Sequence, residues 1–161
     1  MRSIGSSVLT ALILALAVAL PTAAGSQRPM RGSFMLTVVP VDQRCGPNDL
    51  TLGFTGIGHA THLGSITGGA SNCTEPSLGT DAVAIWDGTA TFVAADGSVL
   101  TTSYAGMQEA PVAGIASVVS NHTVVSGTGR FAGASGSWQL SGEVDFVTGT
   151  SGGTISGWVS Y

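Results

Sequence analysis

Short runs of apolar or alternating residues, each ended by glycine or an Asp-Gly pair, make up residues 34–161, and helical periodicity is absent throughout. Asp87-Gly88 and Asp96-Gly97 are the clearest breaks, because Asp-Gly between two alternating runs is typical of a hairpin turn. The pattern predicts about eight strands. Their expected ranges are 34–41, 50–55, 59–67, 82–86 together with 89–94, 98–104, 112–125, 137–147 and 154–161.

Strict alternation in two of these runs predicts strands that bury one face. Leu50, Leu52 and Phe54 alternate with small residues, and Trp138 and Leu140 alternate with polar ones. An open sheet of this size would leave long edges, and only 9% of the residues are charged, too few to protect them. Closure removes the edges, and the abundant glycines supply the necessary bulges and bends. We therefore expect an all-β fold, a closed eight-stranded antiparallel barrel over 34–161, after a short polar lead at 25–33.

The N-terminal 24 residues have the pattern of a secretory signal peptide. Residues 8–20 contain a single polar side chain, a run shorter than the roughly 20 apolar residues that a permanent membrane span needs. Pro21 ends this run, and the small residues Thr22 and Ala24 predict cleavage after Ala24. An uncleaved anchor is the alternative. The expectation is a secreted, extracytoplasmic protein that begins at Gly25.

The charge of the chain excludes two classes of partner. Without residues 1–24 the sequence has four arginines, no lysine and nine acidic residues, a formal charge of −5. Nucleic-acid binding requires a basic surface, and anionic membranes attract basic segments. We therefore expect no nucleic-acid partner, and no membrane association once the signal peptide is removed.

Cys45 and Cys73 are the only cysteines, and in an exported domain an even pair predicts a disulfide. The bond would close a loop of 28 residues. A metal site is the alternative, but neither cysteine has a second thiol or a histidine at ligand spacing. The sequence thus predicts a disulfide and no metal.

His59 and His62 are the most noticeable polar pair. Residues three apart on a regular strand point to opposite faces, so the two imidazoles would not share a metal. One of them is expected to face the barrel interior, where it would be a candidate general acid or base. A hydrogen-bonded structural histidine is the alternative.

Other polar features of the sequence do not identify a reaction. Glu143 and Asp145 share the polar face of their strand, which indicates a solvated exterior. Asn72-Cys73-Thr74 and Asn121-His122-Thr123 match the acceptor pattern for N-glycosylation. Known catalytic and nucleotide-binding motifs are absent in a suitable setting, so no cofactor is expected.

Residues 125–138 (VSGTGRFAGASGSW) resemble the glycine-flanked aromatic turn of the allene oxide cyclase-like and dirigent barrels. Residues 54–64 (FTGIGHATHLG) are similar to a segment of exported bacterial proteins related to this barrel. Glycine permits a tight corner here, and Phe131 is expected to plug a barrel end or a gap between strands. The catalytic acids of the dirigent proteins cannot be matched to this sequence residue by residue.

The resemblance implies an eight-stranded barrel, often a homotrimer, with a cavity for an apolar small molecule. Members include cyclases and proteins that hold a reactive intermediate folded, which lowers a barrier by restricting conformation. Four aromatic side chains are the candidates to line such a pocket: Trp86, Phe92, Tyr104 and Trp138.

The leading hypothesis is therefore an exported barrel that binds a polyketide- or lipid-like compound and assists its cyclisation or isomerisation without a cofactor. A non-catalytic binding or surface protein, with the barrel filled by its own side chains, is the alternative.

Overall fold

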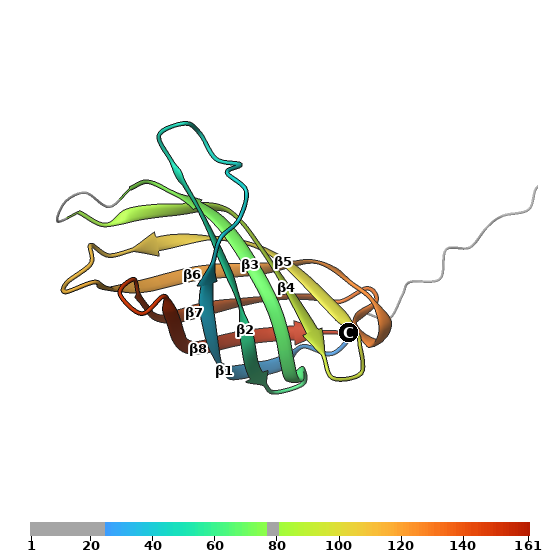
Figure 1. Cartoon of the computed structure of the whole chain (residues 1–161). Coiled ribbons are helices and arrows are strands. Elements are labelled where there is room, and N and C mark those ends of the chain that lie inside the picture. The colour runs from blue at the N-terminus through green and yellow to red at the C-terminus, as the bar shows by residue number, and fades with distance from the viewer. Residues whose placement is uncertain (1–24, 77–80) are drawn as a thin grey trace, which may run out of the picture.

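The structure is a computed structural model that describes residues 25–76 and 81–161. The predicted signal peptide lies outside these ranges, so its cleavage stays a prediction. In the described ranges no helix is both long and apolar enough to cross a membrane. The elements are β1 (Arg28–Val39), β2 (Leu50–Ala60), β3 (Gly64–Thr74), β4 (Val83–Ala94), β5 (Val99–Gln108), β6 (Ile115–Gly127), the 3-10 helix η1 (Gly129–Phe131), β7 (Ser135–Asp145) and β8 (Thr150–Ser160) (Figure 1).

The eight strands form one closed antiparallel barrel in chain order, which confirms the predicted fold class (Figure 1). Every strand pairs with its neighbours in the sequence, and β1 also pairs with β8, from Arg28 opposite Val159 to Thr37 opposite Thr150. This last ladder satisfies both strands that would otherwise be edges. The low charge of the chain is thus compatible with a sheet that has no free edge.

Several strand boundaries differ from the expected ones. Asp87-Gly88, expected as a break typical of a hairpin turn, lies inside β4, where the pairing with β5 shifts register between Ile85 and Gly88. β1 begins at Arg28 rather than Phe34, because Arg28 to Ser33 pair with β8 and much of the expected polar lead is strand. The range 59–67 is interrupted by a tight turn, in which the Leu63 amide donates to the Ala60 carbonyl at 3.2 Å. His62 and Gly64 adopt positive φ angles of 70° and 76° there, so β2 ends at Ala60.

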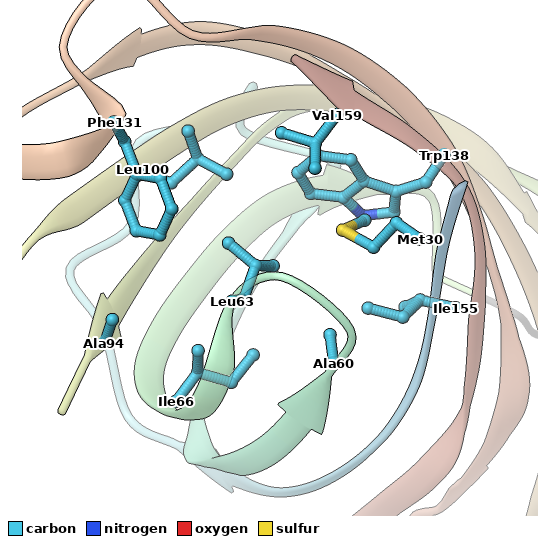
Figure 2. Packing of buried hydrophobic residues seen from close by; sticks show 10 residues of the cluster. All are labelled: Met30, Ala60, Leu63, Ile66, Ala94, Leu100, Phe131, Trp138, Ile155 and Val159. Atoms are coloured by element: carbon cyan, nitrogen blue, oxygen red, sulfur yellow. The ribbon is translucent and has the colours of Figure 1, made fainter. Parts of the chain in front are cut away.

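The two ends of the barrel are built differently. The connections β1–β2, β3–β4, β5–β6 and β7–β8 lie at one end, called the mouth below, away from the C-terminus marked in Figure 1. The opposite end, called the filled end, is occupied by a buried apolar cluster (Figure 2). Its members are Met30, Ala60, Leu63, Ile66, Ala94, Leu100, Phe131, Trp138, Ile155 and Val159.

Phe131 plugs the filled end, as the sequence predicted for its ring. The side chain is 0% exposed and meets the Tyr161 ring edge-on, with centroids 5.1 Å apart. Gly129 precedes it with a φ of 59°, a conformation that glycine adopts without strain. The role of this turn is therefore packing.

The predicted disulfide is present. Cys45 in the β1–β2 connection is bonded to Cys73 on β3, with Cα atoms 5.7 Å apart. Arg44 fastens the same connection to β4 through an ion pair with Asp87 and to β3 through the Ser71 carbonyl at 3.2 Å. The longest described connection at the mouth is thus held against the barrel wall by covalent and ionic contacts.

Candidate functional site

A cavity occupies the half of the barrel nearer the mouth. Its volume is about 60 Å³, and an adjoining hollow of about 50 Å³ shares Phe34, Leu36, Ala70, His122 and Leu140 with it. Each is several times the roughly 10–15 Å³ that one water molecule needs. No lining side chain is charged, and the walls are apolar apart from a few polar groups. The polar lining residues of the cavity are Asn72, Tyr104, Gln108, Ser120, His122 and Ser151.

Strand register stacks three rings beside the cavity. Tyr104 on β5 lies opposite His122 on β6, which in turn lies opposite Trp138 on β7. The His122 ring is 4.5 Å from the Tyr104 ring and 5.8 Å from the Trp138 ring, and both pairs are nearly parallel. Phe92 on β4 meets the edge of this stack, 5.7 Å from Trp138. The stack holds the imidazole in one orientation.

His122 is buried and hydrogen-bonded at both ring nitrogens. It is 3% exposed, and its Nδ1 and Nε2 contact the hydroxyls of Thr102 at 3.1 Å and Ser120 at 3.2 Å. Burial lowers the pKa of His122 to about 4, because the charged imidazolium would lose its hydration. At neutral pH the ring is therefore uncharged, with one nitrogen donating a hydrogen bond and the other accepting one.

Tyr104 and Asn72 form a second polar pair in the wall. The Tyr104 hydroxyl donates to Asn72 Oδ1 at 3.0 Å, and Asn72 Nδ2 donates to the Cys73 carbonyl at 3.2 Å. Burial raises the pKa of the Tyr104 phenol, so it stays protonated. One face of the Tyr104 ring lies on Gly88, where an added Cβ would come within 2.6 Å of three ring carbons.

We predict that Gly88→Ala displaces the Tyr104 ring and breaks its hydrogen bond with Asn72. The overpacking should lower the free energy of unfolding by about 1–3 kcal/mol, measured by urea denaturation. Near-ultraviolet circular dichroism should report the moved tyrosine. Gly152→Ala is the matched control, because a Cβ there meets nothing closer than 3.6 Å. A Gly88→Ala protein with unchanged stability and spectrum would contradict the packing described.

This arrangement is suited to holding an uncharged molecule rather than to attacking one. The described partners of His122 are two hydroxyls and not a carboxylate, so no negative charge supports an imidazolium. Among residues 25–76 and 81–161, no three His, Cys, Asp or Glu side chains are grouped to hold a metal ion. The site offers apolar walls and oriented neutral hydrogen-bonding groups.

The expectation that His59 or His62 faces the interior is wrong. His59 lies on the outer face of β2 and is exposed, because Ala60 next to it points inward. His62 is exposed in the turn that separates β2 from β3, with its backbone carbonyl accepting from the Tyr161 hydroxyl at 2.7 Å. The regular strand assumed for 59–67 is interrupted here, and neither imidazole approaches the cavity.

The four aromatic residues predicted to line a pocket lie in different parts of the barrel. Phe92 lines the adjoining hollow and Tyr104 lines the cavity. Trp138 belongs to the buried cluster (Figure 2), with its ring stacked on His122. Trp86 is half-buried opposite Cys73, at the irregularity of β4, and is not a lining residue.

Sequence reasoning missed the residues at the centre of the site. His122 and Asn72 drew attention only as parts of the two glycosylation patterns. Alternation of Ser120, His122 and Val124 would have placed the imidazole on the inner face of β6. The structure also separates the two acceptors, because Asn72 is buried in the wall whereas Asn121 is exposed.

Comparisons with known proteins give a similarity to several solved structures, among them two dirigent proteins. No family model and no curated protein matches the chain. The pterocarpan synthase dirigent protein PsPTS1 is 17% identical, with a TM-score of 0.46, over 87% of this chain and 98% of its own. The pterocarpan synthase dirigent protein GePTS1 is 14% identical, with a TM-score of 0.47, over 92% and 99%. Sequence identities and TM-scores this low do not imply that this protein shares the activity of those proteins.

Proposed function

We propose that this protein is an exported barrel that binds a small apolar molecule in the cavity of its open half together with the adjoining hollow. One observation carries the proposal: the filled end is closed by a packed cluster, while the other half keeps an uncharged cavity with polar groups in its wall. Mostly apolar pockets with a few oriented polar groups are typical of small-molecule sites. A barrel whose only role was structural would gain stability by filling this space.

The second part of the proposal is that the bound molecule cyclises or isomerises because it is held folded. The walls would restrict its conformation, which lowers a barrier without a nucleophile. The amides of Asn72 and Gln108 would orient a hydroxyl or carbonyl group of a polyketide- or lipid-like compound. Burial keeps His122 neutral, so its part would be hydrogen bonding rather than proton abstraction.

Binding without turnover is the alternative function, and one observation favours it. The lining residues include no carboxylate, lysine or arginine, so proton transfer lacks an ionised group. A search for products after incubation with candidate compounds distinguishes the alternatives, because both share the same cavity.

Leu140→Trp should abolish binding while the fold survives. Leu140 lines both the cavity and the adjoining hollow, so an indole at this position would occupy the space. We expect the affinity for 2-phenylethanol, a neutral single-ring probe, to fall at least tenfold by isothermal titration calorimetry. Gln139→Trp is the matched control, because Gln139 is exposed on the outer face of the same strand. Equal affinities of the two variants, or no binding by the parent protein, would refute the proposed site.

A further inference from the structure

Carboxylates are concentrated at the mouth of the barrel. Six of them lie in its four connections or at the adjoining strand ends: Asp42, Asp49, Glu75, Asp81, Glu109 and Asp145. Arg44 is the basic residue at this end of the described chain, and its ion pair with Asp87 occupies it. Arg28, Arg31 and Arg130 lie toward the filled end. The barrel is therefore electrically polarised along its axis, with the negative pole at the entrance.

A hollow at the mouth adjoins both this negative region and the cavity. Its volume is about 220 Å³, and its lining residues are Leu50, Leu52, Thr74, Glu75, Gln108, Pro111 and Phe146. Leu52 and Gln108 also line the cavity, so the two spaces meet at these side chains. The wall of the hollow combines apolar surface with the carboxylate of Glu75.

Gln108 independently indicates that a polar group of the ligand lies where the mouth hollow adjoins the cavity. It is only 4% exposed, and its side-chain amide has no hydrogen-bond partner among the described residues. The one fully buried side-chain polar atom without a partner in the described residues is Trp138 Nε1, so the Gln108 amide faces open space and is satisfied there by water or by a ligand group. Because this side chain lines both spaces, a polar group near the neck between them would supply the missing hydrogen bond.

We propose that the ligand is an amphipathic organic cation, whose apolar part occupies the cavity and whose ammonium group lies in the mouth hollow near Glu75. This inference rests on the proposed function and specifies its ligand class. The uncharged cavity accepts only the apolar part, so the charged group must remain at the mouth. There the summed field of the carboxylates attracts a cation and repels an anion.

Three probes with the same phenylethyl group test the charge preference. They are 2-phenylethylamine, 2-phenylethanol and 3-phenylpropionate, which carry a positive, a neutral and a negative group. By calorimetry at low salt we expect the amine to bind best and the carboxylate worst, with at least about a tenfold difference between them. The difference should shrink in 0.5 M salt, because ions screen charges at this exposed end.

Two variants test whether the preference for a positively charged ligand arises from the carboxylates at the mouth. Glu75→Gln combined with Glu109→Gln should weaken binding of the amine severalfold and leave the Kd of the alcohol unchanged. Asp96→Asn, which removes a carboxylate at the filled end, should change neither value. If the alcohol binds but the amine and the carboxylate bind equally, the charge preference is refuted while the proposed function stands. If none of the three probes binds, both proposals fail.

Discussion

Loss of the Cys45–Cys73 disulfide is expected to lower the free energy of unfolding by about 3–4 kcal/mol. The bond closes a segment of 28 residues, and in the chain-entropy description its removal frees the unfolded chain by this amount. Cys45→Ser combined with Cys73→Ser, followed by urea denaturation, measures the change. The parent protein unfolded with and without reductant gives a second measurement of the same quantity.

The double variant is its own control, because reductant should no longer affect it. Leu50 and Leu52 follow the connection that carries Cys45, and both line the mouth hollow. Binding of 2-phenylethanol should therefore weaken along with stability. Equal stability of the oxidised and reduced parent proteins would show that Arg44 and the neighbouring hydrogen bonds suffice to hold this connection.

Acidification should destabilise the protein by roughly 3 kcal/mol through His122 alone. The pKa of the buried imidazole is lowered to about 4, whereas in the unfolded chain it returns to its ordinary value of 6.5. Between pH 6.5 and about pH 4, the His122 side chain binds a proton in the unfolded chain but not in the native protein. Stability is therefore fully present above pH 6.5, is lost progressively as the pH falls to about 4, and changes no further below it through this group.

The prediction is measured as a difference in slope. His122→Gln should flatten the dependence of unfolding free energy on pH between 6.5 and 4, after each protein is normalised to its own value at pH 7. His59→Gln should keep the parent slope, because its imidazole is exposed. A His122→Gln protein with the parent slope would contradict the buried, neutral imidazole.

The strands could be predicted from the sequence because they depend on local patterns, and closure could be predicted because so few charges would protect the edges of an open sheet. Alternating residues determine which face of a strand is buried, and Asp96-Gly97 is the turn it was expected to be. The disulfide followed from the expected compartment and the even cysteine pair, and the plugging role of Phe131 from the glycine-flanked aromatic turn at 125–138. These features need no knowledge of which strand lies beside which.

A cavity was expected from the family resemblance, but the polar residues around it could not be predicted, because their positions depend on register between strands. Tyr104, His122 and Trp138 are far apart in the sequence and meet only because β5, β6 and β7 pair as they do. His59 and His62 failed for a related reason, since a turn without a glycine at its centre divided one expected strand into two. Because β2 ends at Ala60, the histidines predicted to face the interior lie on the surface instead.

The pairing of β1 with β8 also determines when the chain can complete its folding. Until its last strand, Thr150–Ser160, is available, β1 and β7 both present unsatisfied edges to any neighbouring chain. Contacts between such distant parts of a sequence form late and slowly. Assembly is thus all or nothing: a product that stops short of β8 is an aggregation hazard rather than a smaller working barrel.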